Sequence, residues 1–130
     1  MFSLVFPGQG SQTIGMGKDF FESYDLVKDL FKQADDSLGA SLSKIILEGP
    51  KDELDLTINT QPAIFLISYS IFQVMKKEFN LDLDNAKYFA GHSLGEYSAL
   101  CAANYLSFSD TIKLLKIRGE AMQNAVPKGE

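Results

Sequence analysis

The 130-residue sequence contains no tryptophan, one cysteine and one histidine, and its 12 basic residues are outnumbered by 17 acidic ones. A single cysteine cannot form an internal disulfide, and no CxxC motif, histidine pair or carboxylate cluster has the spacing of a metal site. No basic stripe is present that could neutralise the phosphates of a nucleic acid. The composition therefore predicts neither a metal or other cofactor nor nucleic-acid binding.

Long apolar runs are also missing. The most apolar stretch, residues 64–71, contains Ser68, Tyr69 and Ser70 and is too short to cross a bilayer. The N-terminus lacks the basic segment and long apolar run of a secretion signal. We therefore expect a cytoplasmic protein without a membrane segment. With 45% apolar and 22% charged residues, the chain can form one domain with a hydrophobic core.

The most informative stretch present is Gly-His-Ser-Leu-Gly at residues 91–95. It follows an apolar run, 87–90, that predicts a buried strand, and precedes a small-residue-rich run, 96–100, that predicts a helix. A G-x-S-x-G motif at a strand-to-helix turn is typical of a nucleophile elbow, because the glycines leave room for a serine in a tight turn. Ser93 is then a candidate nucleophile, and the N–H of Leu94 a candidate oxyanion donor. The alternative is a glycine-rich turn with an incidental serine.

The remaining pattern predicts a mostly helical chain. The predicted strands are 2–6 and 87–90, and the predicted helices are 16–39, 41–47, 51–56, 59–79, 96–104 and 108–124. Helix 59–79 is apolar almost all round and should be central, with a polar cap at residues 59–61 and Pro62 in its first turn. Ser107 and Asp110 predict the N-terminal cap of the last helix. Pro127 and Gly129 predict a break after it.

Two further features carry open alternatives. The loop at residues 7–12 has glycines on both sides of Gln9, which suits either a close backbone approach or a plain turn. It is not a phosphate-binding loop, because no glycine is followed directly by Lys-Ser or Lys-Thr. The single cysteine, Cys101, lies among small apolar residues and is predicted to be a reduced core thiol rather than a reactive one.

Arg118 is unusual for its place on the last helix. At 100° per residue it falls within the apolar arc, which consists of Phe108, Ile112, Leu114, Leu115, Ala121 and Met122. The opposite, polar arc consists of Lys113, Lys116, Glu120, Gln123 and Asn124. A guanidinium on an apolar face must snorkel, pair with a buried carboxylate or bind an anionic ligand. Structural pairing and ligand binding both remain open for Arg118 at this point.

Four separated motifs together resemble the malonyl-CoA:acyl-carrier-protein transacylase family, which includes the acyltransferase domains of fatty-acid and polyketide synthases. They are Phe-Pro-Gly-Gln-Gly-Ser-Gln at 6–12, Thr-Gln-Pro-Ala at 60–63, Gly-His-Ser-Leu-Gly-Glu-Tyr-Ser-Ala at 91–99 and Arg-Gly at 118–119. The resemblance implies an α/β fold, the N-terminal part of an α/β-hydrolase-like acyltransferase core, mostly helical with a few short parallel strands. Residues 1–130 would form part of the large subdomain, and the ferredoxin-like small subdomain and C-terminal part would be absent.

The resemblance also implies roles for single residues. Ser93 would accept malonyl from malonyl-CoA and pass it to the phosphopantetheine thiol of acyl carrier protein, in fatty acid biosynthesis. The backbone amides of Gln9 and Leu94 would form the oxyanion hole, and Arg118 would clamp the free carboxylate of malonyl. Gln61 would also bind the substrate, with a weaker claim.

In the family, the general base is a histidine far downstream of the arginine. This sequence departs from the family because it contains no histidine after Arg118. The one histidine here is His92, whose side chain should diverge from that of Ser93 at a sharp turn, so we expect it to pack beside the bound substrate rather than act as the base. The isolated chain should then be nearly inactive.

Two other functions compete with malonyl transfer. One is a non-catalytic module that binds acyl-CoA or carrier protein or complements a second chain. The other is a serine hydrolase, which Arg118 disfavours.

Unpaired strand edges would also favour self-association of such a piece of the family fold.

Overall fold

Helices dominate the computed structural model, which describes residues 1–126. The elements in chain order are β1 (Ser3–Phe6), α1 (Lys18–Ser23), α2 (Asp25–Leu38), α3 (Leu42–Glu48), α4 (Lys51–Leu54), α5 (Thr57–Lys77), the 3₁₀ turn η1 (Leu83–Asn85), β2 (Tyr88–Gly91), α6 (Gly95–Ala102) and α7 (Phe108–Ala125). The two strands are parallel neighbours in one sheet. The expected α/β chain, mostly helical with short parallel strands, is confirmed.

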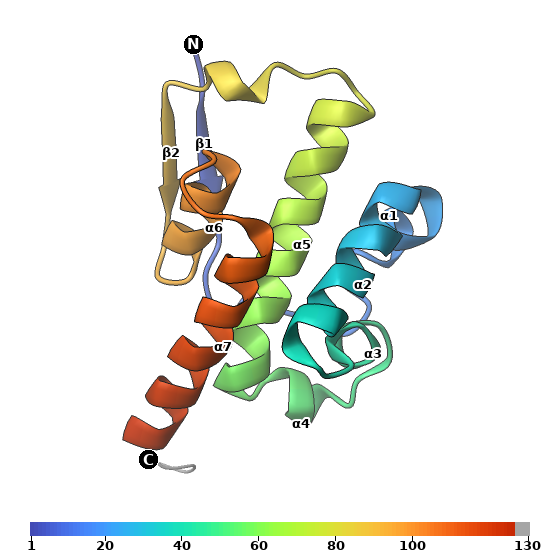
Figure 1. Cartoon of the computed structure of the whole chain (residues 1–130), viewed down its shortest axis with the longest axis vertical. Helices are drawn as coiled ribbons and strands as arrows, with labels where there is room; N and C mark the ends of the chain where they lie inside the picture. The colour runs from blue at the N-terminus through green and yellow to red at the C-terminus, as the bar shows by residue number, and fades with distance from the viewer. Residues whose placement is uncertain (127–130) are drawn as a thin grey trace.

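The short sheet places two loops at the same edge. Ser3 pairs with Tyr88 and Phe6 with Gly91, so both strands run in the same direction and end side by side (Figure 1). The backbone N–H of His92 donates to the carbonyl of Phe6 at 3.2 Å, which extends the pairing by one residue. Parallel strands require a long crossover, which α1 to α5 supply. As a result, the loop after β1 and the elbow after β2 lie next to each other.

Helix α5 runs through the middle of the molecule, as its apolar surface predicts. Figure 1 shows it between the layer of β1, β2, α6 and α7 on one side and α1 to α3 on the other. Phe65 on this helix is fully buried, and its ring stacks on Tyr69 and on Phe108 of α7 with centroids 5.8 and 5.5 Å apart. Burial of such rings supplies much of the driving force for folding. The helix therefore fixes where α6 and α7 sit relative to the sheet.

The predicted single helix over residues 16–39 is wrong, because the chain forms two helices there. Gly17, with φ 74°, precedes α1, and Tyr24 between α1 and α2 is extended, with φ −129° and ψ 119°. The Tyr24 ring lies edge-on to that of Phe79, which follows α5, with centroids 6.4 Å apart. This contact is between distant segments, so a local pattern does not encode the break. Gly39 ends α2 with φ 62°, as expected.

The predicted start of α5 is also wrong, because the helix begins at Thr57 and Pro62 lies inside it. The polar side chains expected to cap it bond to the preceding segment instead. Asn59 Nδ2 donates to the carbonyl of Glu53 at 2.8 Å, and the hydroxyl of Thr60 donates to the carbonyls of Leu54 and Leu56. These bonds tie α4 to α5, which makes the early start favourable despite the missing N–H of Pro62.

The predicted apolar face of α7 is too wide. The buried residues are Thr111, Ile112, Leu115 and Gly119, a narrow stripe that packs on α5 and its neighbours. Leu114 is 42% exposed, and Ala121 and Met122 are also exposed. The helical wheel located the centre of the face but not its width, because only the neighbouring helices decide how far around α7 the contact extends. The Ser107 cap is confirmed, since its hydroxyl accepts from the N–H of Asp110 at 3.1 Å.

Two further predictions concern the break after the last helix and the absence of a membrane segment. The break predicted at Pro127 lies outside the described residues. Among residues 1–126, no helix combines the length and the apolar character needed to span a bilayer. Each strand has one paired edge, so within this described part the outer edges of β1 and β2 carry no strand partner.

Candidate active site

The motif at residues 91–95 forms a sharp strand-to-helix turn. β2 ends at Gly91, α6 begins at Gly95, and the N–H of Gly95 donates to the carbonyl of His92 at 2.9 Å. Ser93 has φ 56°, in the left-handed region that a residue with a side chain rarely adopts. A strained serine between a strand and a helix is the backbone geometry of a nucleophile elbow.

The two glycines of the motif are required by close backbone contacts. A Cβ on Gly91 would overlap the carbonyl of Gly95 and the amide of Glu96. A Cβ on Gly95 would overlap the carbonyl oxygen of Phe6, at the end of β1. The turn is therefore closed on itself and pressed against the neighbouring strand. This agrees with the steric reason for which the sequence analysis singled out both glycines.

Near this turn, two backbone N–H groups donate no hydrogen bond to any group within residues 1–126. Leu94 precedes the first turn of α6, and within residues 1–126 its N–H donates to no other group. The N–H of Gln9, in the loop after β1, likewise has no acceptor in the described part of the chain. That loop lies against the elbow, because a Cβ on Gly8 would fall 2.6 Å from the carbonyl oxygen of His92. The side chain of Gln9 donates to the hydroxyl of Thr57 at 3.3 Å, which ties the loop to α5.

Arg118 lies next to Ser93. Its Nη2 donates to Ser93 Oγ at 3.2 Å, and its Nη1 donates to Oε1 of Gln61 at 2.6 Å. The guanidinium carbon lies 5.5 Å from the centroid of the Tyr97 ring, a cation–π distance. Three predicted site residues, Ser93, Gln61 and Arg118, are therefore brought together from α5, the elbow and α7.

No carboxylate among residues 1–126 balances the charge of Arg118. Every ion pair found among residues 1–126 involves a lysine, and Arg118 takes part in none of them. Its partners are a neutral amide and a hydroxyl, although the side chain is half-buried. Of the alternatives that the sequence left open, pairing with a buried carboxylate is thus not found in the described structure. A half-buried cation without a counter-ion favours an anionic ligand.

The His92 side chain is exposed and lies against the loop after β1. A Cβ on Gly8 would lie 2.9 Å from its Nδ1, so the ring packs over the loop after β1. Within residues 1–126 no hydrogen bond joins its ring to Ser93, whose hydroxyl only accepts one from Arg118. The serine proton therefore has no acceptor in the described part of the chain, which leaves room for a base from elsewhere.

Sequence reasoning missed three residues that shape this site. Tyr97 covers the Arg118 guanidinium, Met122 Sδ accepts from Nε2 of Gln61 at 2.9 Å, and Gly119 allows α7 to approach α5 closely. Met122 follows Arg118 by four residues, so helical spacing alone placed both on one face. Tyr97 and Gly119 lie within the motifs at 91–99 and 118–119, but the sequence assigned them no role, because their roles depend on the packing of different helices.

Cys101 is not a second nucleophile. It is 3% exposed on α6, and burial raises the pKa of its thiol to about 11 although the Thr111 hydroxyl lowers it slightly. A thiol with that pKa carries almost no thiolate at neutral pH. The prediction of a reduced core thiol is confirmed. No group of three or more histidine, cysteine, aspartate or glutamate side chains within residues 1–126 is placed to hold a metal ion.

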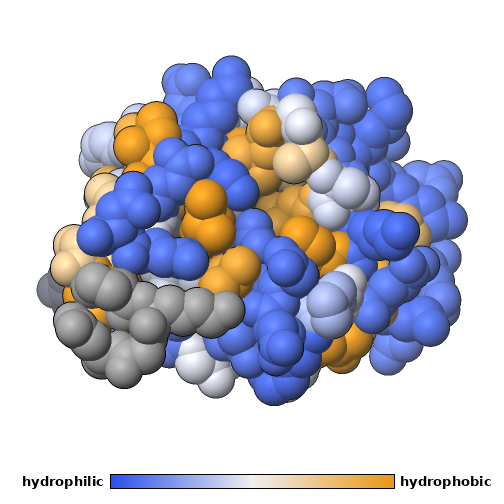
Figure 2. Space-filling model, turned by 90° about the horizontal axis from the view of Figure 1, so that it is seen from below, coloured by the Kyte–Doolittle hydropathy of each residue, from blue (hydrophilic) through white to orange (hydrophobic). Residues whose placement is uncertain are grey.

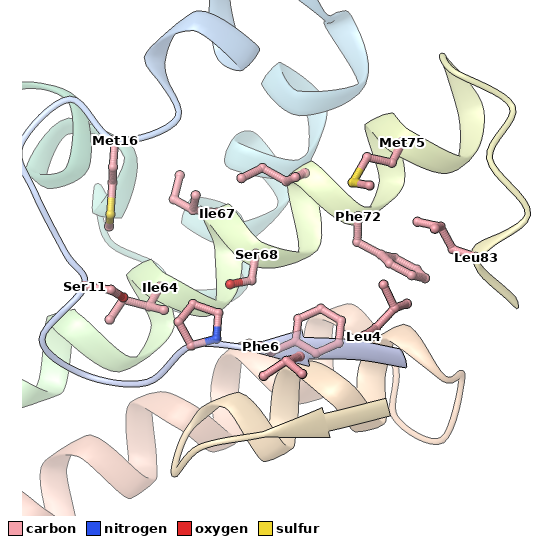
Figure 3. A pocket seen from close by; sticks show the side chains of 13 residues that line it. Leu4, Phe6, Ser11, Met16, Ile64, Ile67, Ser68, Phe72, Met75 and Leu83 are labelled. Carbon is pink, nitrogen blue, oxygen red and sulfur yellow. The ribbon is translucent and has the colours of Figure 1, made fainter. Parts of the chain in front are cut away.

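A separate apolar cavity of about 320 Å³ lies between β1 and α5. Figure 3 shows side chains of β1, such as Leu4 and Phe6, facing those of α5, such as Ile64 and Phe72. Ser11 and Ser68 are the polar side chains in its wall, and neither Ser93 nor Arg118 lines it. The cavity therefore offers volume but no charged group. Figure 2 shows the molecule from below, where hydrophobic patches interrupt a mostly hydrophilic surface.

Comparison with known proteins agrees with this geometry. The family model described as acyl transferase domain matches residues 3–130. The chain is 49% identical over 128 residues to a malonyl CoA-acyl carrier protein transacylase of Haemophilus influenzae, covering 98% of this chain and 40% of the relative. Identity to the Bacillus subtilis protein of the same name is 48%, with 98% and 39% covered. The chain thus spans about two fifths of the length of these relatives.

Solved structures give the same picture. The crystal structure of an acyl-carrier-protein-S-malonyltransferase from Bartonella henselae superposes with a TM-score of 0.92 at 50% identity, over 100% of this chain and 42% of that one. A malonyl-transacylase in complex with a type II polyketide synthase acyl-carrier protein gives a TM-score of 0.89 at 41% identity, over 98% of this chain and 40% of the other. The arrangement of β1, α5, the elbow and α7 is therefore shared with these proteins.

Proposed function

Because the chain belongs to the acyl transferase domain family, we propose that it supplies the nucleophile, the oxyanion hole and the carboxylate clamp of a malonyl-CoA:acyl-carrier-protein S-malonyltransferase. The donor would be malonyl-CoA and the acceptor the phosphopantetheine thiol of acyl carrier protein. The names of its relatives support this substrate pair. The role would be in fatty acid biosynthesis, and a reduced, buried Cys101 suits a reducing compartment such as the cytoplasm.

The first half-reaction loads the enzyme. Ser93 Oγ attacks the thioester carbonyl of malonyl-CoA, a C–O bond forms, and the oxyanion accepts hydrogen bonds from the N–H groups of Leu94 and Gln9. When the C–S bond breaks, coenzyme A leaves with the proton that a base removed from Ser93. Malonyl is then held as an ester, with its free carboxylate on Arg118. In the second half-reaction the carrier-protein thiol attacks the ester carbonyl, a C–S bond forms as the C–O bond to Ser93 breaks, and the thiol proton passes through the base to Ser93 Oγ.

The single observation that carries the proposal is the contact between Arg118 and Ser93. Arg118 Nη2 lies 3.2 Å from the nucleophilic oxygen. A short acyl chain attached to that oxygen can therefore bring its terminal carboxylate to the guanidinium. With no carboxylate of the described residues bound to it, the guanidinium is free to take a carboxylate of the substrate in a bidentate pair. A neutral acyl group would leave this cation unsatisfied, which disfavours an ordinary serine hydrolase.

We further propose that the general base lies outside these 130 residues. The His92 ring packs over Gly8, and its backbone is held by Phe6, so it is poorly placed to take the proton of Ser93. Residues 1–130 would then be part of the large subdomain, and the ferredoxin-like small subdomain and the remaining strands would come from the rest of a longer chain. By itself the 130-residue chain should turn over very slowly.

The open strand edges support one more proposal about partners. β2 borders a groove of about 560 Å³ that includes Tyr88, Leu100 and Tyr105, and all three side chains are exposed. An unpaired strand beside exposed apolar side chains favours association. We propose that this chain pairs with the remaining part of the fold or, when that part is missing, with a second copy.

Intact-mass spectrometry after incubation with malonyl-CoA tests the function. We expect the full-length protein to gain one malonyl group that disappears in Ser93→Ala, and the 130-residue chain to gain it far more slowly. An adduct that persists in Ser93→Ala would overturn the assignment of the nucleophile. Binding of malonyl-CoA without any adduct would favour a non-catalytic binding module, and steady hydrolysis of neutral esters would favour a hydrolase.

A further inference from the structure

The environment of Gln61 differs from that of a residue that contacts substrate. Its side chain is 1% exposed, and both ends of its carboxamide are engaged. Oε1 accepts from Arg118 at 2.6 Å, and Nε2 donates to Met122 Sδ at 2.9 Å. An arginine can only donate, so the carbonyl oxygen of Gln61 must face it and the amide N–H must face the sulfur. Little of this carboxamide remains for a ligand.

We propose that Gln61 is a positioning residue, whose carboxamide, oriented by Met122, holds one amino group of Arg118 and thereby turns the other toward Ser93. This rests on the proposed function, because it concerns the residue expected to clamp the malonyl carboxylate. It replaces the expectation that Gln61 binds substrate directly.

The rigid shape of the guanidinium makes one contact sufficient to direct another. Its five N–H groups lie in one plane in a fixed fork, so fixing Nη1 restricts where Nη2 can point. The Tyr97 ring, 5.5 Å from the guanidinium carbon, restricts the remaining rotation of that plane. With Gln61 at one amino group and Tyr97 on the face, Nη2 lies 3.2 Å from Ser93 Oγ.

The helix crossing that brings these groups together depends on Gly119. A Cβ at this position would lie 2.8 Å from the Cα of Ile58 and 2.9 Å from the carbonyl oxygen of Thr57. The backbones of α5 and α7 therefore touch directly beside Arg118 and one turn from Gln61. A larger residue would push the helices apart and lengthen the bond between Gln61 and Arg118.

The neutrality of Gln61 matters as much as its position. A buried glutamate there would form an ion pair with Arg118 and compete with the carboxylate of the substrate. An amide accepts the hydrogen bond and leaves the full positive charge for the ligand. The structure thus separates two tasks, with Gln61 directing the cation and Arg118 carrying the charge.

The test compares malonyl and acetyl loading of Ser93 from their CoA thioesters in the full-length protein, by single-turnover mass spectrometry. In Gln61→Met, which keeps the volume but removes the acceptor, we expect malonyl loading to fall about 30-fold, with acetyl loading within about threefold of the wild type. Gln61→Glu should reduce malonyl loading more than Gln61→Met does. Gln73→Met, at the other buried glutamine of α5, serves as the matched control and should change neither rate.

The outcomes separate the inference from the proposed function. If the wild type takes no malonyl, the proposed function fails; if it does but Gln61→Met keeps its malonyl-to-acetyl ratio, the positioning role fails. An equal loss of both acyl groups would also overturn it, because a merely structural glutamine would have that effect. Should Gln61→Met fold poorly, Met122→Leu at an exposed position tests the same chain of contacts, with a smaller loss of malonyl selectivity expected.

Discussion

The elbow is formed by five consecutive residues, whereas the Arg118 guanidinium is held by side chains from two other helices and from the elbow itself. In the elbow, Gly91 lets the turn close on itself, Gly95 leaves room for the carbonyl of Phe6 on β1, and Ser93 has a left-handed φ. Around Arg118, by contrast, Gln61 and Tyr97 come from parts of the chain far from it in sequence. The first region depends on backbone space, and the second on the relative placement of helices. The two should therefore respond differently to substitution.

Gly95→Ala should produce the largest effect. Its Cβ would overlap the carbonyl oxygen of Phe6, so either the elbow or the end of β1 must move. We expect a loss of stability of roughly 3 kcal/mol or more and no acyl loading. Urea unfolding of the full-length protein measures the first and mass spectrometry the second.

The matched control is Gly39→Ala, at a glycine with φ 62° and no atom near its missing Cβ. It should cost only the left-handed backbone penalty, roughly 1–2 kcal/mol, and leave acyl loading unchanged. Gly95 has no left-handed φ, so equal destabilisation by the two substitutions would show that its close contact with Phe6 costs no more than the backbone penalty at Gly39.

Arg118→Ala should break the second region without disturbing the first. Malonyl loading should fall about 100-fold because the substrate carboxylate loses its bidentate partner, while acetyl loading changes much less. Single-turnover loading of both acyl groups gives the comparison. Arg118→Lys keeps the charge but loses the planar fork, so its malonyl loading rate should lie between those of the wild type and Arg118→Ala. Equal loss of malonyl and acetyl loading would mean that Arg118 is structural.

Gly119→Ala tests whether the clamp depends on helix spacing. The added methyl would meet the backbone at Thr57 and Ile58, so we expect a destabilisation of about 1–3 kcal/mol from overpacking. The rate of malonyl loading should fall more than the rate of acetyl loading, because the hydrogen bond between Gln61 and Arg118 lengthens. Thermal unfolding and loading rates measure these effects, and Ala121→Ser on the exposed side of α7 is the control. A stable Gly119→Ala with normal loading would contradict the close crossing.

The smallest effect concerns Cys101, which follows the elbow by two turns but is buried on α6. Its pKa of about 11 in the folded protein lies above the ordinary value near 9, so the unfolded chain loses the proton first. Its contribution to stability is complete below about pH 9 and is lost as the pH rises toward 11. The loss should be on the order of 1–2 kcal/mol.

Urea unfolding of the wild type and Cys101→Val between pH 8 and 11 isolates this contribution. The pKa of Tyr69 is also raised, chiefly by burial and then by the charge of Cys101, so the difference between the two proteins includes the effect of the thiolate on Tyr69. A pH dependence that is the same in both would mean that the Cys101 thiol is not responsible.

The chain order of elements was largely predictable, because apolar periodicity and glycine breaks are local signals. Helix α5 was recognised as central from its apolar surface, and the cap at Ser107 from two polar residues. The break at Tyr24, the early start of α5 and the narrow face of α7 were not predictable. Each depends on contacts that a helix makes with other elements, such as Tyr24 with the distant Phe79 or Asn59 with Glu53 of the preceding helix. Local propensity carries no record of such contacts.

For the site, the sequence by itself determined the elbow, since its glycines, serine and flanking elements are contiguous; only the contact of Gly95 with Phe6 on β1 required the folded chain. It also singled out Arg118 as a cation with an unexplained place on a helix. Only the tertiary structure decided that Gln61 holds this cation, that Tyr97 covers it and that it faces Ser93. The physical reason is that a long, flexible charged side chain is directed by what it packs against, and the packing of α5 on α7 at Gly119 arises only when the chain folds.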